Sequence, residues 1–549
     1  MIKLSQISGN IVDLVQNRIY GGTIVIENGR ISEIYEDNDT YESFIIAGFV
    51  DAHVHIESSM LTPYEFARMA SLHGTVATIS DPHEIANVLG LEGIEFMIKN
   101  AEAAPLKCHF GAPPCVPATT FETAGNTITA DDIEYLFKKY PNIKYLSEVM
   151  NFPGVLAKDP DMMAKIALAK KYKKKIDGHA PNLRGAAAKQ YIEEGISTDH
   201  ECFTLEEALD KLMYGMKIII REGSAAKNYE ALIPLLETYS DRLMFCSDDK
   251  HPNDLAVGHI NELVKRSVKR GLNVMEVLRV ASLNPIKHYG LDVGLLQVGD
   301  AADMVVVNNL TDFEVESTYI NGYLVAQEKT SMLEYRSCEL LNNFETSKKT
   351  LKDFEIKATA ENIKVIEALD GQLITNALEM KVKTDSSGNA ISDTENDVLK
   401  LAVVNRYEDA EVALAFIKNF GLKRGAIASS VAHDSHNIIA VGATDTDILR
   451  AVNLLIEAKG GLVAVDGEKE AVLPLPLAGI MTNENAWTVA RQYTELDRMA
   501  KALGSPLHSP YMTLSFMALL VIPNLKLSDK GLFDGEKFQF TDVFVKGNV

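Results

Sequence analysis

The chain has 549 residues, too many for one hydrophobic core, so we expect two or three domains. Hydrophobic residues make up 46% and charged residues 24% of the sequence, which is typical of a globular protein and excludes disorder, collagen-like repeats or coiled coil as its main state. The formal net charge of -22 repels phosphate backbones, and no basic patch offsets it, so no nucleic-acid partner is expected.

Two strand-rich segments lie on either side of a long central region. Residues 22–34 alternate apolar and polar side chains around Asn28-Gly29, which is a strong signal for a β-hairpin. Residues 294–325 have the same character, with a turn at Asn321-Gly322. We predict that the two segments pair into one small β-sandwich domain that is split in sequence.

Between these segments, short apolar runs alternate with amphipathic helical stretches. The runs that fit strands are residues 49–55, 76–81, 107–113, 143–149, 174–180, 196–201, 216–222 and 242–248. Strands that alternate with helices form a parallel sheet, and eight of them over this length favour a (β/α)8 barrel over an open sheet. In such barrels the functional residues lie where strands end and the following loops begin.

The last part of the chain has a different composition and a different pattern of apolar residues. A polar, charged connection follows Tyr335, and mixed α and β patterns then continue to the end, with strand-like residues at 399–407 and 461–467. The fold class is therefore predicted as α/β: a TIM barrel, a split β-sandwich and an additional C-terminal α+β domain. The predicted domains are 1–47 plus 291–345, 48–290 and 361–549.

The sequence also indicates where the protein resides. Its five cysteines are far apart and form no CxxC pair, which favours reduced thiols in a cytoplasm. The first residues lack the pattern of a signal peptide, and the apolar stretch near 512–522 is shorter than the roughly 20 residues that span a bilayer. We expect a cytoplasmic protein without a membrane partner. A homo-oligomer is expected, with a dimer ahead of other forms.

His53 and His55 are the first candidate metal ligands in the sequence. They are two residues apart at a strand end, so both imidazoles point to one face and can bind one ion, although such a pair can also be a polar pair that faces solvent. Four later strand ends carry Glu148, His179, His200 and Asp248. Six ligands at one barrel mouth are enough for two divalent ions that share a bridging carboxylate and a bridging hydroxide. The sequence therefore predicts a binuclear metal centre.

Other polar residues are expected at the same mouth. Asp81, His83 and Glu84 end the second strand, where they could bind substrate nitrogens, orient a metal-binding histidine or cap the next helix. Ser58 and Ser59 are expected to cap a helix. Glu57 is expected to contact the metal ligands without binding the metal itself.

Three further sites are weighed against plainer structural roles. Asp249 and the pair Arg221-Glu222 are candidates for substrate or supporting contacts, with a surface salt bridge as the alternative. Far downstream, His433 and His436 form a second group of metal-competent side chains. A pocket wall or lid is the first interpretation of that group, structural hydrogen bonding the second and an additional metal the last.

Long stretches of the sequence resemble a known family. The segment AGFVDAHVHIESSMLTPYEFARMASLHGTVATISDPHEIANVLG, together with SEVMNFPGV, DGHAPNL, STDHE and CSDD, resembles the amidohydrolase superfamily and, within it, the bacterial adenine deaminases. Near the end, GLKRGAIASSVAHDSHNIIAVG, LPLPLAGIMT and MTLSFMALLVIPNLKLSD resemble the C-terminal domain of adenine deaminases, which most other superfamily members lack. The resemblance covers almost the whole chain.

The resemblance implies a ligand set and a reaction. It implies that His53, His55 and Asp248 bind one metal, that His179 and His200 bind the second, and that Glu148 bridges both. A glutamate at that position, where many relatives have a carboxylated lysine, fits the deaminases and weighs against hydantoinases and dihydroorotases. The implied metals are manganese or iron. The implied reaction, in purine salvage, is attack of a metal-bridging hydroxide on C6 of adenine, which gives hypoxanthine and ammonia.

The implied chemistry assigns catalytic roles. Asp248, beside the bridging hydroxide, can act as general base and then as general acid, although it could be a metal ligand only. We count Glu148 and Glu84 with it as predicted catalytic residues. Two alternatives stand beside adenine deamination: another amidohydrolase reaction on a different purine or a cyclic amide, and a scaffold without activity. The last is disfavoured because none of the six ligands is missing.

Overall fold

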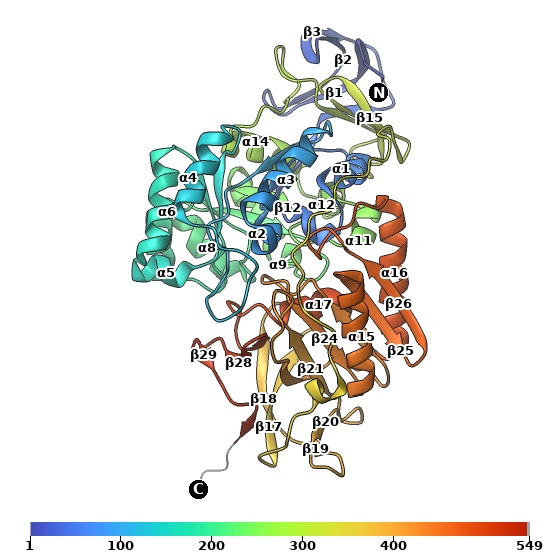
Figure 1. The fold of residues 1–549 in the computed structure, drawn as a ribbon. Coiled ribbons are helices and arrows are strands. Elements are labelled where there is room, and N and C mark those ends of the chain that lie inside the picture. The colour runs from blue at the N-terminus through green and yellow to red at the C-terminus, as the bar shows by residue number, and fades with distance from the viewer. Residues whose placement is uncertain (1, 546–549) are drawn as a thin grey trace.

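The two strand-rich segments at the ends of the barrel region join in one sheet. The computed structural model describes residues 2–545. The sheet has eight strands in the order β16-β15-β14-β13-β4-β1-β2-β3 and forms one end of the molecule (Figure 1). Its central junction is the antiparallel pair of β4 and β13, in which Met304 faces Ala47. Its strands are β1 (Gln6–Asp13), β2 (Arg18–Glu27), β3 (Arg30–Asp37), β4 (Phe44–Ala47), β13 (Met304–Val307), β14 (Val315–Ile320), β15 (Tyr323–Gln327) and β16 (Thr330–Ser331).

Both predicted hairpin turns are confirmed. Asn28 and Gly29 connect β2 to β3 with φ angles of 52° and 78°, and Asn321 and Gly322 connect β14 to β15 with φ angles of 49° and 73°. A two-residue turn with positive φ at both positions matches the right-handed twist of the strands, and Asn-Gly adopts it at low cost. The local sequence thus sets the pairing of these strands.

A (β/α)8 barrel occupies the middle of the chain, as predicted. All eight predicted strands are present: β5 (Phe49–Val54), β6 (Thr75–Ser80), β7 (Lys107–Phe110), β8 (Tyr145–Val149), β9 (Lys175–Gly178), β10 (Thr198–Asp199), β11 (Lys217–Arg221) and β12 (Leu243–Cys246). Parallel pairing joins β5 to β6 and β7, β8 to β9, and β10 to β11 and β12, and a parallel bridge between Ala112 and Leu146 links the end of β7 to β8. A bridge between Val54 and Asp248 closes the barrel from β12 back to β5. Every residue of β5 and β6 is buried, as expected for strands covered on both faces.

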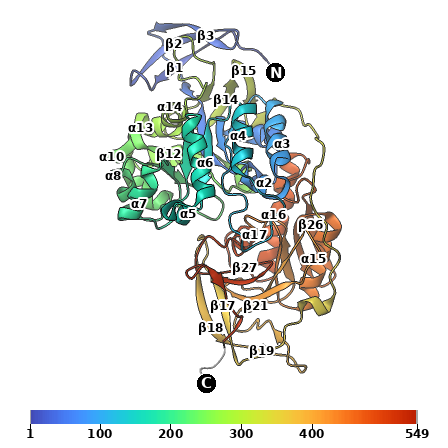
Figure 2. The ribbon, with the colours of Figure 1, turned by 60° about the vertical axis from the view of Figure 1, so that its left-hand side comes forward.

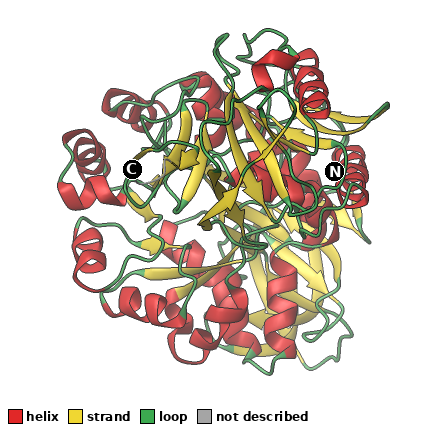
Figure 3. Cartoon of the chain, turned by 90° about the horizontal axis from the view of Figure 1, so that it is seen from below, coloured by secondary structure: helices red, strands yellow, loops and turns green. Residues whose placement is uncertain are grey.

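Helices surround the barrel, and most lie at the periphery of the view in Figure 3. Several begin at strong sequence signals: Thr129 and Asp132 form a capping box at α4, and Asp159 caps α6 just before Pro160. The helices of this region are α1 (Pro63–Ala70), α2 (His83–Leu89), α3 (Leu91–Glu102), α4 (Ala130–Lys139), α5 (Phe152–Ala157), α6 (Pro160–Lys171), α7 (Gly185–Glu193), α8 (Leu205–Met213), α9 (Tyr229–Leu232), α10 (Leu236–Tyr239), α11 (Pro252–Val257), α12 (Ile260–Lys269), α13 (Val274–Leu278) and α14 (Asn284–Tyr289).

The C-terminal part is an α+β unit built on a nine-stranded sheet. Helix α15 packs against β23, β24 and β25 of that sheet. The sheet contains β17 (Asn362–Ala368), β18 (Thr375–Lys381), β21 (Val398–Val404), β22 (Ala413–Lys418), β23 (Ala426–Ser429), β24 (Ile438–Gly442), β25 (Gly461–Asp466), β26 (Lys469–Pro474) and β30 (Phe544–Val545). The remaining elements are β19 (Lys383–Thr384), β20 (Ala390–Ile391), β27 (Leu525–Ser528), β28 (Gly531–Asp534), β29 (Gln539–Phe540), α15 (Asp445–Ala458), α16 (Ala486–Ala502) and α17 (Pro510–Phe516).

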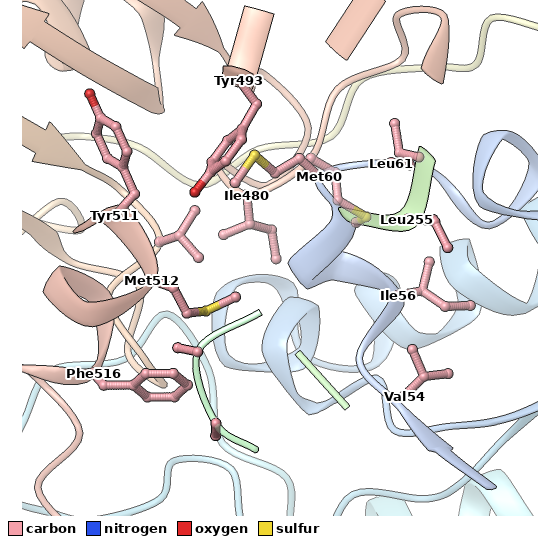
Figure 4. Packing of buried hydrophobic residues seen from close by; sticks show 14 of the residues in the cluster. Val54, Ile56, Met60, Leu61, Leu255, Ile480, Tyr493, Tyr511, Met512 and Phe516 are labelled. Carbon is pink, nitrogen blue, oxygen red and sulfur yellow. The ribbon is translucent and has the colours of Figure 1, made fainter. Parts of the chain in front are cut away.

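The C-terminal unit lies directly below the barrel in Figure 1, and the turned view in Figure 2 shows the same contact. One buried apolar cluster crosses the boundary: Val54, Ile56 and Met60 from the barrel belong to the same cluster as Tyr511 and Phe516 from the C-terminal unit (Figure 4). Because Val54 is the last residue of β5 and Ile56 and Met60 follow it, the C-terminal unit is held over the barrel mouth. Among the helices of residues 2–545, none combines the length and the apolar character that crossing a bilayer requires.

Candidate metal centre

The six predicted ligands meet at the barrel mouth. Glu148 lies within β8, and His53 is the penultimate residue of β5. The other four follow their strands by one or two residues, which points their side chains into the space above the barrel. All six are buried, with exposed fractions of 6% or less: His53, His55, Glu148, His179, His200 and Asp248.

Three of these side chains converge on one point. The Nε2 atoms of His53 and His55 are 3.2 Å apart, and Oδ1 of Asp248 is 3.5 and 3.2 Å from them. The Nδ1 atom of His55 is 3.2 Å from the backbone carbonyl of Asp81, to which it can donate. That bond leaves the Nε2 lone pair free for an ion, the arrangement that supporting contacts give to metal-binding histidines.

Glu148 lies between two groups of histidines. Its Oε1 is 3.3 Å from Nε2 of His55, while its Oε2 is 2.7 Å from Nδ1 of His179 and 3.3 Å from Nε2 of His200. Burial raises the pKa of the Glu148 carboxyl, but the adjacent His179 and the other histidines outweigh it and hold that pKa well below its usual value. One ionised carboxylate thus presents an oxygen to each histidine group.

The donor set fits divalent transition metals. Imidazole nitrogens and carboxylate oxygens are the ligands that such ions take, and groups of three of these atoms lie within 4.8 Å of one another. Two buried Nε2 atoms 3.2 Å apart can share a cation, whereas at most one can donate to the other. Among the described residues, Nε2 of His179 is also buried without a partner. The mouth therefore holds candidate sites for divalent metals.

Arg221 is a buried partner of Asp248. Its Nη1 is 2.5 Å from Oδ2 of Asp248 and also contacts Glu201, and its Nη2 is 3.1 Å from Oε2 of Glu201. Arg221 is 1% exposed, which rules out the alternative of a surface salt bridge for this residue. Glu222, by contrast, pairs with the part-exposed Arg266 at 2.7 Å.

Sequence reasoning missed Glu201. This residue directly follows His200 in STDHE, and its Oε1 is 3.4 Å from Nε2 of His200. The sequence does offer a signal for it, because a carboxylate that directly follows a predicted ligand at a strand end lies close to the metal site. Its partner Arg221, which lies on the neighbouring strand, could not be inferred from spacing alone.

The backbone at Asp248 is held in an unusual conformation. Its φ angle is 52°, in the left-handed region that costs a residue other than glycine about 1 kcal/mol or more. The amide of Asp248 donates to the His53 carbonyl at 3.0 Å, and the amide of His55 donates to the Asp248 carbonyl at 3.3 Å. Closure of the barrel therefore fixes the carboxylate beside the two histidines.

Asp81 and His83 lie against the same ligands. Oδ2 of Asp81 accepts from the amide of Glu148 at 3.2 Å, and its Oδ1 accepts from the amide of His83 at 3.1 Å, at the start of α2. His83 directs its Nδ1 to Oε1 of Glu148 at 3.4 Å. The Asp81 carboxylate thus holds the backbone of Glu148 and the first amide of α2, while the N-cap position of that helix is Pro82 and has no side-chain cap.

The capping prediction for Ser58 and Ser59 is wrong, because the side chain of Thr62 caps α1. Ser58 was expected to cap a helix, but its hydroxyl donates to Oδ1 of the buried Asp249 at 2.5 Å. Ser59 instead closes its own turn by donating to the Ile56 carbonyl at 2.6 Å. A hydroxyl beside a buried carboxylate provides a charge-assisted hydrogen bond, which is stronger than a cap. Glu57 accepts from the amide of Ile85 at 3.3 Å and so contacts α2.

The C-terminal histidines reach this site. His433 Nδ1 is 2.6 Å from Oε1 of Glu84, and His436 Nε2 contacts Oε2 of the same residue. Burial raises the pKa of the Glu84 carboxyl, but His433 and His436 outweigh it and hold that pKa well below its usual value. One cavity is lined by the metal-centre residues and by C-terminal side chains, namely Leu373, His433, Asp434, Phe516 and Leu519. His433 thus lies in the wall of this cavity, whereas His436 is not among the residues that line it.

Known proteins match this chain over two regions and over its whole length. The model of the amidohydrolase family matches residues 44–325, and that of the adenine deaminase C-terminal domain matches residues 372–539. An adenine deaminase of Sulfurovum sp. strain NBC37-1 is 55% identical over 98% of this chain and 99% of its own. Adenine deaminases of Salinibacter ruber and Methanosarcina mazei are 51% and 49% identical, each over 98% of this chain and 99% of their own. With both domains matched and full-length relatives near half identity, the chain belongs to the adenine deaminase family of the amidohydrolases.

Proposed function

We propose that this protein converts adenine and water into hypoxanthine and ammonia, as a step of purine salvage. The observation that carries the proposal is the position of Glu148, whose two oxygens face two separate histidine groups in one cavity. A purine C6 is a poor electrophile and its amine is a poor leaving group. The site must therefore supply a strong nucleophile and deliver a proton to nitrogen.

Two divalent ions, manganese or iron, are the proposed cofactors. When bound, such ions lower the pKa of a bound water from about 15.7 toward about 7 and so provide hydroxide near neutral pH. In this assignment His53, His55 and Asp248 would hold one ion, His179 and His200 would hold the other, and Glu148 would serve both. The nitrogen-rich donor set supports transition metals over calcium or magnesium.

Asp248 is the proposed proton carrier. Its Oδ1 faces His53 and His55, and its Oδ2 is held by Arg221. Burial raises the pKa of Asp248, but Arg221 and the histidines outweigh it and hold that pKa well below its usual value, so the carboxylate is ionised, which is the form that a general base needs. It takes a proton from the attacking water and returns it to the purine ring or to the departing amine as ammonia leaves C6.

The surrounding residues receive supporting roles in this proposal. Asp81 fixes the backbone of Glu148, and Glu201 fixes Arg221. Glu84 is proposed as a catalytic carboxylate that contacts the purine, while His83 and Asp249 are proposed to bind substrate or to support the ligands. Their burial on the cavity wall supports these roles.

A substrate panel tests the proposal. Manganese-loaded protein should release ammonia from adenine and should leave guanine and cytosine unchanged. Dihydroorotate, followed by ring opening, should also be unchanged. Fully metallated protein that does not turn over adenine would overturn the proposal. Turnover of dihydroorotate in its place would assign the site to cyclic amide hydrolysis.

His53→Ala should reduce the metal content from two ions to about one per chain. The substitution removes one of the four proposed donors to the first ion, which are His53, His55, Asp248 and the shared Glu148, and leaves His179 and His200 in place. Elemental analysis of purified protein after dialysis measures the change. His508→Ala, which alters an exposed histidine, is the matched control and should retain both ions. Unchanged metal content in His53→Ala would contradict the ligand assignment.

Cellular location and assembly remain predictions. All five cysteines are free thiols, which supports a reducing cytoplasm. The proposed homodimer would have a mass of twice 60.4 kDa, which light scattering of the purified protein measures directly.

A further inference from the structure

His433 belongs to the C-terminal unit, but its side chain lines the cavity of the metal centre. Its backbone amide donates to the Ser515 carbonyl at 3.2 Å. Its imidazole stacks on the Phe516 ring with centroids 4.7 Å apart and planes 15° apart. These contacts fix the position and the plane of the ring, so its two nitrogens have defined directions.

The two ring nitrogens of His433 are in different situations. Nδ1 donates to Oε1 of Glu84 at 2.6 Å. Nε2 is buried and, among the described residues, has no hydrogen-bond partner. A buried polar atom without a partner is unfavourable, and in a cavity wall it marks a place where a ligand supplies the missing partner.

The contact with Glu84 accounts for one of the two ring nitrogens. Nδ1 of His433 is 2.6 Å from Oε1 of Glu84, which is direct hydrogen-bond distance. Nδ1 is therefore already satisfied, and only Nε2 is available.

The charge around His433 decides whether Nε2 donates or accepts. The carboxylates of Glu84 and Asp434 lie 2.6 and 3.8 Å from Nδ1, and Asp249 adds to their field. Burial lowers the pKa of His433, but Glu84 and the other carboxylates outweigh it and raise that pKa to about 9. The imidazole is thus a cation near neutral pH, and its Nε2 carries a hydrogen.

We propose that the Nε2–H group of His433 donates a hydrogen bond to a ring nitrogen of the bound purine. The proposal rests on the proposed function, because it assumes that a purine occupies this cavity. Adenine offers acceptors at N1, N3 and N7 and no ring carbonyl. A cationic donor at N1, next to C6, would also draw electrons away from the carbon under attack, whereas a donor at N3 or N7 would position the base.

Analogues that lack one ring nitrogen test the proposal by binding. Calorimetry of manganese-loaded protein measures the dissociation constants of adenine, 1-deazaadenine, 3-deazaadenine and 7-deazaadenine. One analogue should bind about 10- to 100-fold more weakly than adenine, because a hydrogen bond from a charged donor is lost. His433→Phe keeps a flat ring on Phe516. This variant should bind adenine more weakly by a similar factor, and its affinity for that same analogue should be nearly unchanged.

His436→Asn is the matched control. His436 also contacts Glu84, but it is not among the residues that line the cavity. Its substitution should change the affinity of all four compounds by one common factor. His433→Gln, whose amide can still donate, should recover part of the discrimination. Metal analysis of each variant should still give two ions per chain.

Two results would overturn the inference. In the first, His433→Phe weakens the binding of adenine and of all three deaza analogues by the same factor. In the second, the substitution leaves the affinity for all four compounds unchanged. Ammonia release by wild-type protein is measured separately: if wild type deaminates adenine while either result holds, the inference fails and the proposed function stands. Absence of turnover alone would instead overturn the proposed function, because the binding constants still report on His433.

Discussion

Asp248→Asn should lower kcat for adenine by roughly 10²- to 10⁴-fold while both metals stay bound. Asparagine keeps an oxygen that can face His53 and His55, but it cannot accept a proton at neutral pH. The loss should therefore exceed any loss of metal. Steady-state kinetics and elemental analysis on the same protein sample measure both quantities.

Asp254→Asn provides the control for this prediction. Asp254 lies on α11 and accepts from the Ser224 hydroxyl at 2.5 Å, away from the residues that line the cavity. Its substitution should change kcat no more than a few-fold. An Asp248→Asn protein that holds two metals and turns over adenine at the wild-type rate would show that Asp248 is a ligand only.

Arg221→Met should destabilise the metal-free protein by about 3–5 kcal/mol, because it leaves two carboxylates buried without their cation. Arg221 is 1% exposed and lies between Asp248 and Glu201, which are equally inaccessible. Metals bound at Asp248 replace part of the lost positive charge, so the loaded protein should be destabilised less. The shift of the urea unfolding midpoint, measured with and without metal, tests both statements.

Two other arginine variants separate charge from geometry. Arg221→Lys keeps the charge but loses the planar group that spans two carboxylates, so it should recover only part of the stability. Arg266→Met removes a part-exposed partner of Glu222 and Glu230 and should cost no more than about 1 kcal/mol. An Arg221→Met protein that unfolds at the wild-type midpoint would contradict the role given to this buried ion pair.

The barrel could be predicted from the sequence because its physical signals are local. A strand buried on both faces is mostly apolar, and the run Ile218–Ile220 of β11 is an example, whereas β5 and β6 are buried throughout but also contain polar residues such as Asp51 and Thr78. Ligands such as Glu148 and His200 stand at strand ends, where each polar residue contrasts with the apolar run before it. Local contrast was therefore enough to place the six predicted ligands at one mouth.

Contacts between distant segments could not be predicted in this way. Glu84 and His433 are 349 residues apart, and no local pattern indicates that they meet. Ser58 has the residue type of a helix cap, and only the fold shows that its hydroxyl reaches Asp249. Such pairs are set by the packing of the C-terminal unit on the barrel or by barrel closure, which depend on the whole chain.

The apolar cluster that joins Val54 and Met60 to Tyr511 and Phe516 makes the two parts inseparable. A chain cut between them would expose this cluster to water on both fragments, and each fragment would be prone to aggregate. Heating should therefore melt barrel and C-terminal unit in one calorimetric transition. For the same reason, a C-terminal unit from another protein could be grafted onto this barrel only if it brought a matching apolar face.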